Sequence, residues 1–281
     1  MKFQVINLRP LDSGGYGDVY VGQRSDTGEY VVKKILREWR LQHAREGFGR
    51  EVHVLGRGVP GLVTLLDSDL TAEPPFYVMP YLEGGKLTKH AGRLADNQLQ
   101  NIAAELAWAL ANLHAAFEVH GDVKPDNVLI SRDGGLRIAD PLGNGTLFTI
   151  LFRGNRGGTP GYYAPEIATG RPISQAGDVY SYCVTLHHLL TGRQPVAGQR
   201  LYLSPADFAR SPKICEIITA GWTLEPRSRP TMQDVLQMLR GQRWTEIQAE
   251  RKQRVETLAA VLVGGSLVAL LLSLASGRRR G

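Results

Sequence analysis

The chain is poor in cysteine and has no long apolar run before its last quarter. Its 281 residues include only two cysteines, Cys183 and Cys215, and both lie in apolar stretches with helical spacing. Two such cysteines exclude a disulfide framework and a cysteine-rich metal site, and they are typical of buried, reduced thiols in the cytosol. Residues 1–10 lack the apolar segment of a secretory signal. We therefore expect a cytosolic domain that is large enough to bury a substantial core.

The excess of basic residues is small over most of the chain. The formal net charge is +6, from 33 Lys/Arg and 27 Asp/Glu, and six of the basic and three of the acidic residues lie in residues 246–281. Residues 1–245 therefore carry only +3. A nucleic-acid-binding domain shows a larger and more clustered positive charge, so we expect no nucleic-acid partner.

A polar loop between two apolar segments, at residues 120–130, combines several groups that are suited to one chemistry. It reads HGDVKPDNVLI, in which the flanks resemble short buried strands and the PDN run favours a turn. Asp122 can accept a hydroxyl proton, Lys124 can steady a transferring phosphate and Asn127 can hold Mg²⁺, which together suit phosphoryl transfer. The alternative is an ordinary turn that is rich in Asp, Asn and Pro.

This loop resembles the protein-kinase catalytic loop, H-R-D-L-x-x-x-N, with Gly121 in the place of the arginine. Over roughly residues 8–240 the chain resembles the Hanks-type (eukaryotic-like) serine/threonine protein kinase family, in the membrane-anchored bacterial style. The resemblance implies an α+β, two-lobed fold with an antiparallel sheet and one helix in residues 1–82, which include the hinge, and a mainly helical lobe in residues 83–241. It also implies transfer of the γ-phosphate of ATP, with Mg²⁺ or Mn²⁺, to serine and threonine hydroxyls of protein substrates. In this family the three groups named above, Asp122, Lys124 and Asn127, are catalytic.

A glycine-rich turn between two predicted strands, at residues 12–18, lets backbone N–H groups approach phosphates. It resembles the kinase glycine-rich loop, except that Asp12 replaces its first glycine. An acidic side chain at that position would weaken the approach of phosphate. The positions that the resemblance assigns to nucleotide binding are Ser13, Gly14, Gly15, Gly17, Val19, Lys33, Glu51, Met79, Pro80 and Leu82.

Two of these positions form an expected ion pair. Lys33 resembles the strand lysine that contacts the α- and β-phosphates, and its neighbour Lys34, on the opposite face of the strand, is the alternative. Apolar residues at helical spacing predict a helix within residues 36–57. In it, Glu51 resembles the glutamate that pairs with the strand lysine. Two other acidic residues compete for this role, Glu38 and Glu46.

The segment before the second lobe resembles the adenine-binding hinge. Further strands are predicted at residues 59–66 and 76–79, which would complete a five-stranded sheet. Met79 resembles the gatekeeper residue, and the Pro80 carbonyl and the Leu82 amide would bind adenine. Proline at position 80 removes only a donor, so the acceptor survives.

The second lobe contains five further positions that the resemblance assigns. A helix is predicted at residues 96–117 and a strand at residues 136–139. Asp140 follows this strand in the run Asp-Pro-Leu, where the family has Asp-Phe-Gly and its aspartate binds Mg²⁺. By this resemblance, Asp140 and Asn127 would both bind the metal ion. The run GTPGYYAPE, at residues 158–166, is similar to the kinase G-T-x-x-Y-x-A-P-E segment, in which the threonine helps to dock a substrate. Within the lobe the remaining assigned positions are Thr159, Glu166, Asp178, which would anchor the catalytic loop, and Arg229, which would pair with Glu166.

Residues 258–275 form an uncharged run of eighteen residues. As a helix it would be about 27 Å long, close to the roughly 30 Å apolar thickness of a bilayer. We therefore expect a single-pass membrane helix, a juxtamembrane linker at 242–257 and a short basic tail at 276–281, and a buried terminal helix is the alternative. Basic residues flank both ends, so charge does not set the orientation, but ATP chemistry requires the kinase-like part in the cytoplasm. Small residues four apart in this run hint at a homodimer.

Two other functions compete with an active protein kinase. The replacements at Asp12, Gly121 and Asp-Pro-Leu are compatible with a pseudokinase that acts as a membrane-anchored binding module. A small-molecule phosphotransferase shares the H-x-D-x-x-x-x-N sequence pattern but lacks the run at residues 158–166.

Overall fold

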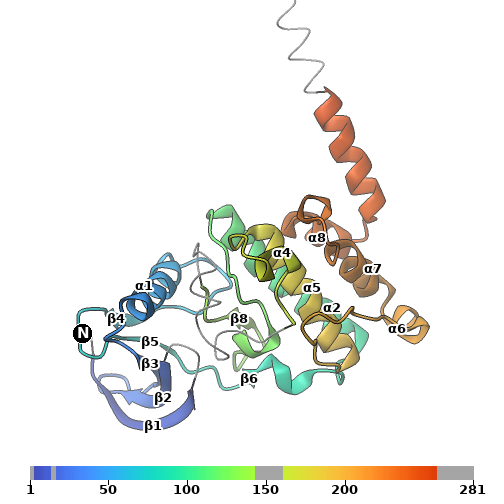
Figure 1. The fold of residues 1–281 in the computed structure, drawn as a ribbon. Coiled ribbons are helices and arrows are strands. Elements are labelled where there is room, and N and C mark those ends of the chain that lie inside the picture. The colour runs from blue at the N-terminus through green and yellow to red at the C-terminus, as the bar shows by residue number, and fades with distance from the viewer. Residues whose placement is uncertain (1–2, 14–16, 143–160, 258–281) are drawn as a thin grey trace, which may run out of the picture.

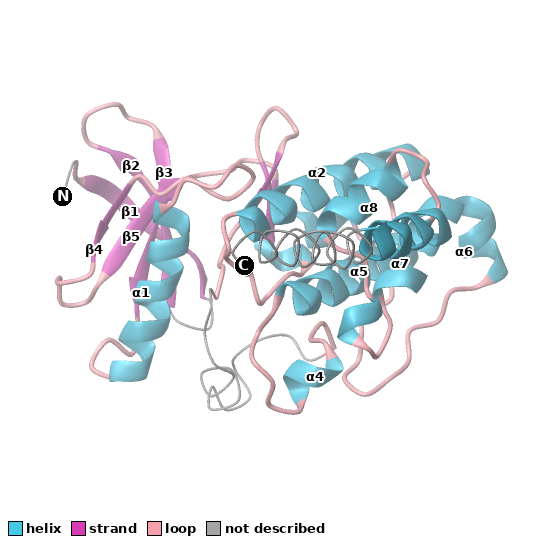
Figure 2. Cartoon of the chain, turned by 90° about the horizontal axis from the view of Figure 1, so that it is seen from above, coloured by secondary structure: helices cyan, strands magenta, loops and turns pink. Residues whose placement is uncertain are grey.

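A computed structural model describes residues 3–13, 17–142 and 161–257 of the chain. Strands gather at the N-terminal end of the molecule and helices make up most of the remainder (Figure 1). The view from above shows the same division, with one helix, α1, beside the large sheet (Figure 2). The predicted two-lobed α+β architecture is therefore present in the described residues.

The N-terminal lobe is built on one five-stranded antiparallel sheet with the strand order β1-β2-β3-β5-β4. The central strands are the most buried, with four consecutive buried residues in β5, whereas β1 at the edge is almost entirely exposed. Its strands are β1 (Val5–Ser13), β2 (Gly17–Arg24), β3 (Tyr30–Leu36), β4 (Asp67–Asp69) and β5 (Phe76–Pro80).

Helix α1 (Gln42–Gly56) covers one face of this sheet. Its buried apolar residues recur at helical spacing, and Phe48 packs against Tyr77 of β5 with ring centroids 5.3 Å apart. Gly58 follows the helix with a φ of 64°, a conformation that favours glycine. The helix predicted within residues 36–57 is confirmed.

The strand predicted at residues 59–66 is wrong, because the last strand of the sheet is β4 at Asp67–Asp69. Leu62 forms only an isolated bridge to Ile138, outside the large sheet. Gly61 lies so close to α2 that a Cβ there would be 2.3 Å from the Ala109 Cβ. The apolar residues of this segment are buried against the helical lobe instead of pairing as a strand.

The second lobe begins with a short strand and is then mainly helical. Two long helices, α2 and α5, run through its core, and α5 is buried on all sides from Gly177 to Leu190. Its elements are β6 (Gly85–Lys86), η1 (Leu87–His90), α2 (Asp96–Ala115), η2 (Pro125–Asn127), β7 (Val128–Ile130), β8 (Leu136–Ile138), α4 (Pro165–Ala168), α5 (Gln175–Thr191), α6 (Pro205–Arg210), α7 (Pro212–Gly221), η3 (Pro226–Ser228) and α8 (Met232–Leu239). Strands β6, β7 and β8 form a small antiparallel sheet beside the polar loop.

The segment predicted as a linker, residues 242–257, is helical from residue 244 onward. Its first turns contact the lobe, since Ile247 is buried and Trp244 packs against the core. Arg251 also pairs with Asp234 of α8. The predicted membrane helix and basic tail, at 258–281, lie outside the described residues. Among the helices that are described, none is long and apolar enough to cross a bilayer.

Candidate active site

The centre of the site is a buried lysine, and it is Lys34 instead of the predicted Lys33. Lys34 Nζ lies 2.6 Å from Glu51 Oε1 and 2.8 Å from Asp140 Oδ1. Successive residues of β3 face opposite sides of the sheet, so only one of the two lysines can face α1. Lys33 faces the other side, where its Nζ lies 3.9 Å from the centre of the Phe76 ring. The count along the chain that favoured Lys33 does not determine the face of a strand.

Glu51 is confirmed as the partner of the strand lysine, and it also accepts a hydrogen bond from the Tyr77 hydroxyl at 2.7 Å. Its competitors Glu38 and Glu46 do not occupy this position. Burial raises the pKa of Glu51 to about 7, although the charge of Lys34 acts against this shift. Lys34 itself has a raised pKa, because its two carboxylate partners outweigh its burial. The lysine is therefore held as a cation between two acidic groups.

Asp140 faces Lys34 from the other lobe. Its backbone is left-handed, with a φ of 58°, which is uncommon outside glycine. Partial burial opposes ionisation, yet the Lys34 charge keeps the pKa of Asp140 below its ordinary value, while 40% of its side chain stays exposed. Two backbone bonds tie this segment to the polar loop, from the Ala139 N–H to the Asn127 carbonyl at 2.8 Å and from the Leu142 N–H to the His120 carbonyl at 2.7 Å. Asp140 is thus an ionised and accessible carboxylate.

The carboxylate of Asp122 is oriented by two neighbours in its own loop. Its Oδ2 accepts hydrogen bonds from Lys124 Nζ at 2.8 Å and from Asn127 Nδ2 at 2.9 Å, and the same amide nitrogen donates to the Asp122 carbonyl at 2.8 Å. The other oxygen, Oδ1, accepts a longer bond of 3.4 Å from the Tyr163 hydroxyl. The three residues that sequence reasoning placed in one loop are therefore brought together.

The polar loop is anchored on α5 through Asp178. The buried Asp178 carboxylate accepts the backbone N–H groups of His120 and Gly121, each at 2.8 Å, and pairs with His114 Nε2 at 2.9 Å. Burial opposes ionisation, but the bonds from His114 and the backbone lower the pKa of Asp178. The contribution of His114 was not predicted. The Asp178 carboxylate, with these three partners, therefore fixes the start of the polar loop.

Gly121, which replaces the family's arginine, is in a left-handed conformation with a φ of 77°. A Cβ at this position would lie 3.0 Å from two side-chain carbons of Ile173. Its neighbour His120 is fully buried, and burial lowers its pKa, so the imidazole is neutral. Its Nδ1 accepts from the Asp122 N–H at 3.2 Å, while its Nε2 contacts the Ala139 carbonyl at 2.9 Å. His120 is therefore a structural histidine.

The glycine-rich turn is described only at its ends, because Gly14 and Gly15 lie outside the described residues. Ser13 ends β1, and Gly17 begins β2 so close to β3 that a Cβ would lie 2.3 Å from the Ile35 carbonyl oxygen. Val19 is paired with Lys34 across the two strands. The third glycine of the motif is thus required by the close approach of the strands.

Asp12, the exception in the glycine-rich motif, is paired with a lysine of the second lobe. Lys86 Nζ of β6 lies 2.5 Å from Asp12 Oδ2, and the Ser13 N–H donates to Asp12 Oδ1 at 2.8 Å. The hydrogen bond from Lys86 lowers the pKa of Asp12. The acidic side chain that was expected to disfavour phosphate is therefore partly neutralised.

The hinge connects the two lobes as predicted. Met79 of β5 is buried, and Pro80 is the last residue of that strand, where it pairs with Val31. Leu82 is partly buried against the main core. The next residues are fixed to the second lobe by the Gly84 N–H, which donates to the Ile130 carbonyl at 3.0 Å.

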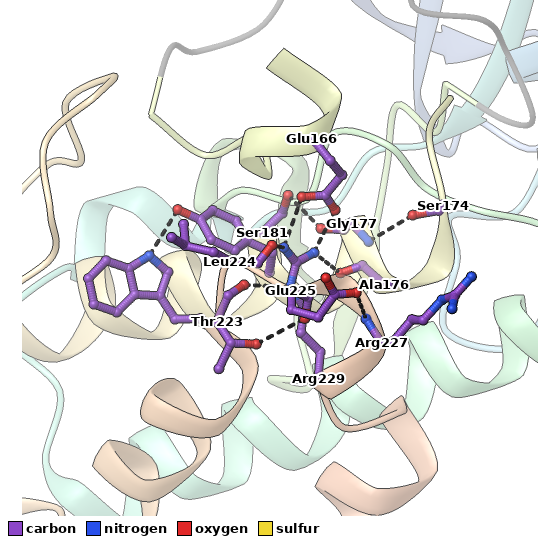
Figure 3. A network of polar contacts seen from close by, with 12 residues as sticks. Glu166, Ser174, Ala176, Gly177, Ser181, Thr223, Leu224, Glu225, Arg227 and Arg229 are labelled. Atoms are coloured by element: carbon purple, nitrogen blue, oxygen red, sulfur yellow. Dashed lines mark hydrogen bonds and ion pairs between the residues drawn. The ribbon is translucent and has the colours of Figure 1, made fainter. Parts of the chain in front are cut away.

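Arg229 and Glu166 form the predicted pair (Figure 3). Arg229 Nη1 and Nη2 contact the two Glu166 carboxylate oxygens at 2.6 and 2.9 Å, and the guanidinium also donates to the Ala176, Thr223 and Leu224 carbonyls. The arginine is 3% exposed. This pair fixes α4 onto the helical lobe, whereas Thr159 lies outside the described residues.

Asn127 and Asp140 fit a magnesium ion. Both bonds of the Asn127 side chain are made by its amide nitrogen, which leaves the amide oxygen as a ligand, and Asp140 supplies an ionised carboxylate. Magnesium binds oxygen ligands, and it commonly takes one or two from the protein and others from phosphates and water. The described residues contain no cluster of three or more His, Cys, Asp or Glu that could hold a metal alone.

Two contacts at the site could not be found from sequence. The bonds of Lys86 and Tyr163 join residues 74 and 41 positions apart along the chain. Lys86 belongs to none of the motifs, and Tyr163 stands at a variable position of the run at residues 158–166. The pattern of β3 does not distinguish its two lysines either, because apolar residues flank both: Val31 and Ile35 share a face with Lys33, and Val32 and Leu36 share a face with Lys34.

Comparison with known proteins places this arrangement in a family context. Residues 6–240 match the family described as protein kinase domain. The chain is 32% identical over 247 residues to the probable serine/threonine-protein kinase PkwA of Thermomonospora curvata, an alignment that covers 82% of this chain and 33% of that protein. It is 28% identical to serine/threonine-protein kinase 36 of Pongo abelii, over 84% of this chain and 19% of that protein. Pkn1 of Myxococcus xanthus, a serine/threonine-protein kinase, is 31% identical over 69% of this chain and 30% of its own length. The chain thus spans a third or less of the length of these relatives.

Proposed function

This chain belongs to the protein kinase domain family, and we propose that it is an active serine/threonine protein kinase that transfers the γ-phosphate of ATP to hydroxyls of protein substrates. The observation that supports the proposal is that the Lys34 ammonium group and the Asp122 carboxylate each contact the polar partners expected for phosphate transfer. Lys34 is held between Glu51 and Asp140, and Asp122 is held by Lys124 and Asn127. A pseudokinase has no need to keep all of these groups in contact.

Each group has a role in the proposed transfer. Lys34 would bind the α- and β-phosphates, and Glu51 would keep the lysine in position. The acceptor oxygen forms a bond to the γ-phosphorus while the bond from the γ-phosphorus to the bridging oxygen breaks and ADP leaves with the electron pair. The acceptor's proton passes to the Asp122 carboxylate, which is buried and whose Oδ1 accepts the longer bond from Tyr163. Lys124, 2.8 Å from Oδ2, would offset the negative charge of the transferring group.

Asn127 and Asp140 would hold the magnesium ion, which when bound neutralises charge on the phosphates. The charge of Lys34 keeps Asp140 ionised, so the carboxylate is ready to receive a cation. The Asn127 amide is oriented by its two bonds to Asp122. Asn127 is thus fixed by contacts that also fix the proton acceptor, whereas Asp140 is held by Lys34.

We also propose that residues 258–275 anchor the chain in a membrane with the kinase domain in the cytoplasm. The length and apolar composition of that run support this part of the proposal. Fractionation of cells that express the full chain, with and without residues 258–281, tests it. Recovery of the full chain in the soluble fraction would contradict membrane anchoring without bearing on kinase activity.

The test of activity is transfer of labelled γ-phosphate from Mg-ATP by the full chain, purified in detergent, to a generic basic protein. Asp122→Asn serves as the control, because it keeps the size of the side chain but removes the proton acceptor. We expect labelled serine or threonine that is lost in the variant. Absence of both transfer and ATP binding would favour the binding-module alternative, and label on a metabolite but never on protein would favour a small-molecule phosphotransferase.

A further inference from the structure

The two oxygens of the Asp122 carboxylate have different surroundings. Oδ2 receives two hydrogen bonds of 2.8 and 2.9 Å, from Lys124 and Asn127, whereas Oδ1 receives the Tyr163 hydroxyl at 3.4 Å. Bonds to ionised acceptors are usually about 2.5–2.9 Å, so the contact from Tyr163 is weak. Oδ1 is therefore the oxygen at which another hydroxyl can most readily replace the existing donor.

The backbone around Tyr163 is fixed by neighbours on both sides. Tyr162 is 2% exposed, its hydroxyl lies 2.6 Å from His188 Nδ1, and its carbonyl accepts a bond of 2.9 Å from Ser181 Oγ. On the other side, Ala164 is fully buried. The backbone on both sides of Tyr163 is therefore held in place, and from this position the Tyr163 hydroxyl reaches Asp122 Oδ1.

We propose that Tyr163 is a positioning residue that covers the proton-accepting oxygen of Asp122 until a protein acceptor arrives. This inference rests on the proposed kinase function. A general base must come within roughly 2.6–3.2 Å of the proton that it removes, so a serine or threonine hydroxyl has to take the place of the tyrosine hydroxyl at Oδ1. The tyrosine then no longer donates to Asp122.

Coverage of Oδ1 would direct phosphate toward protein and away from water. A bound protein makes many remote contacts whose binding energy can displace the tyrosine, whereas water brings none. In both reactions a new oxygen–phosphorus bond forms, the bond to the bridging oxygen breaks, ADP leaves and the proton passes to Asp122. Only the acceptor differs, and with water the product is inorganic phosphate. Tyr163 would thus lower futile ATP hydrolysis.

Tyr163→Phe in the full chain tests this, because it removes one hydroxyl and keeps the ring. We expect ATP hydrolysis without protein acceptor, measured as release of inorganic phosphate, to rise by roughly two- to tenfold, the range that one net hydrogen bond allows. The ratio of hydrolysis to protein phosphorylation should rise with it. Tyr162→Phe is the matched control, because it removes a neighbouring hydroxyl that faces His188, and it should leave the ratio unchanged. Adding Asp122→Asn to Tyr163→Phe should abolish the gain.

The outcomes separate the inference from the function on which it rests. A wild-type chain that neither binds nor uses ATP overturns both. A wild-type chain that phosphorylates protein, together with a Tyr163→Phe variant of unchanged ratio, overturns only the role of Tyr163. Loss of both activities in equal proportion also overturns it, since a merely structural tyrosine would act in that way. Tyr163→Leu provides a second test if Tyr163→Phe is recovered unfolded.

Discussion

Lys34 of the N-terminal lobe and Asp140 of the helical lobe form an ion pair of 2.8 Å across the two halves of the molecule. Glu51 contacts the same lysine at 2.6 Å, so one ammonium group joins the sheet, helix α1 and the segment after β8. A lysine with these partners has a defined position, whereas a lysine on the opposite face of the strand has none of them. The two adjacent lysines should therefore differ sharply in their contribution to activity.

Lys34→Met should lower the rate of phosphate transfer by roughly a hundredfold or more, because the phosphates lose a positioned cation. Lys33→Met is the matched control, since it removes the same charge one residue earlier, from the face on which Lys33 contacts Phe76. It should change the rate by less than about threefold, the effect of a partly exposed charge. Initial rates of phosphate transfer at saturating and at limiting ATP measure the loss of activity in each of the two variants. Equal losses in the two variants would contradict the assignment of Lys34.

The lysine assignment shows where sequence reasoning was limited. The catalytic loop was predictable because Asp122, Lys124 and Asn127 lie within six residues, so their spacing alone brings them together. The choice between Lys33 and Lys34 depended on the face of β3 on which each lysine lies. A count along the chain does not determine that face, and Val19 of β2 is paired with Lys34. The apolar run at 59–66 was buried without pairing as a strand, because burial alone does not distinguish a strand from a core segment.

Contacts between distant residues could be predicted only where a motif supplied both partners. The pair between Arg229 and Glu166 could be predicted because each residue belongs to a sequence motif of the family. Asp12 was noticed as an exception, but its partner Lys86 lies on a short strand without any motif. The helix from residue 244 onward within the predicted linker was not foreseen for a similar reason, since the contacts of Ile247 and Trp244 with the core are tertiary.

Arg229→Met should destabilise the fold strongly, because it leaves the Glu166 carboxylate largely buried without its partner. Removal of one partner from a buried pair reduces the free energy of unfolding by about 3–5 kcal/mol. Arg24→Met is the control, since its pair with Asp26 lies at the surface and should contribute little to the free energy of unfolding. Urea denaturation followed by fluorescence gives both values. The double variant Glu166→Gln with Arg229→Met should recover part of the loss, and a loss below about 1 kcal/mol for Arg229→Met would contradict the role of the pair.

Stability should decrease as the pH falls below about 6.5, in part through His187 of α5. Burial lowers the pKa of His187, which faces Arg193, Asp207 and the Tyr202 carbonyl. Its Nε2 contacts that carbonyl at 3.0 Å, and its buried Nδ1 has no hydrogen-bond partner among the described residues, so an added proton there would be unsatisfied. The unfolded chain binds this proton near pH 6.5 and the folded chain does not.

The contribution of neutral His187 to stability is therefore complete at a pH above the pKa of this histidine in the unfolded chain. It is lost as the pH falls toward the lower pKa of His187 in the folded chain. One such histidine changes the free energy of unfolding by up to about 1.4 kcal/mol per pH unit. Unfolding measured between pH 7.5 and 5.5 should show a smaller slope in His187→Gln than in the wild-type chain. The exposed His90 provides the control, and His90→Gln should keep the wild-type slope. An unchanged slope in His187→Gln would show that this residue takes no part.

Activity should depend little on phosphorylation of residues 143–158. Gly121 stands where the family's arginine would bind a phosphorylated loop, so that charge partner is missing. Thr146→Ala with Thr149→Ala should retain activity within about threefold, whereas Thr159→Ala should reduce it severely. Gly121→Arg should not create dependence on phosphate, because a side chain at a φ of 77° would press on Ile173 and reduce stability. A large loss of activity in the Thr146/Thr149 double variant is the result that contradicts this prediction.

Lys86→Ala should weaken binding of Mg-ATP, because it leaves the Asp12 carboxylate uncompensated beside the glycine-rich turn. The pair is exposed, with 42% and 45% of the two side chains accessible, so the effect should be about two- to fivefold in Kd. Asp12→Ala should not weaken binding, and the Asp12→Ala/Lys86→Ala double variant should return close to the wild-type Kd, since the repulsive charge is gone. Titration of nucleotide at low salt measures the four values, and 0.5 M salt should reduce the differences because it screens exposed charges. If Lys86→Ala weakened binding equally in the presence and absence of Asp12, the lysine would act on the nucleotide directly instead of through the carboxylate that replaces the first glycine.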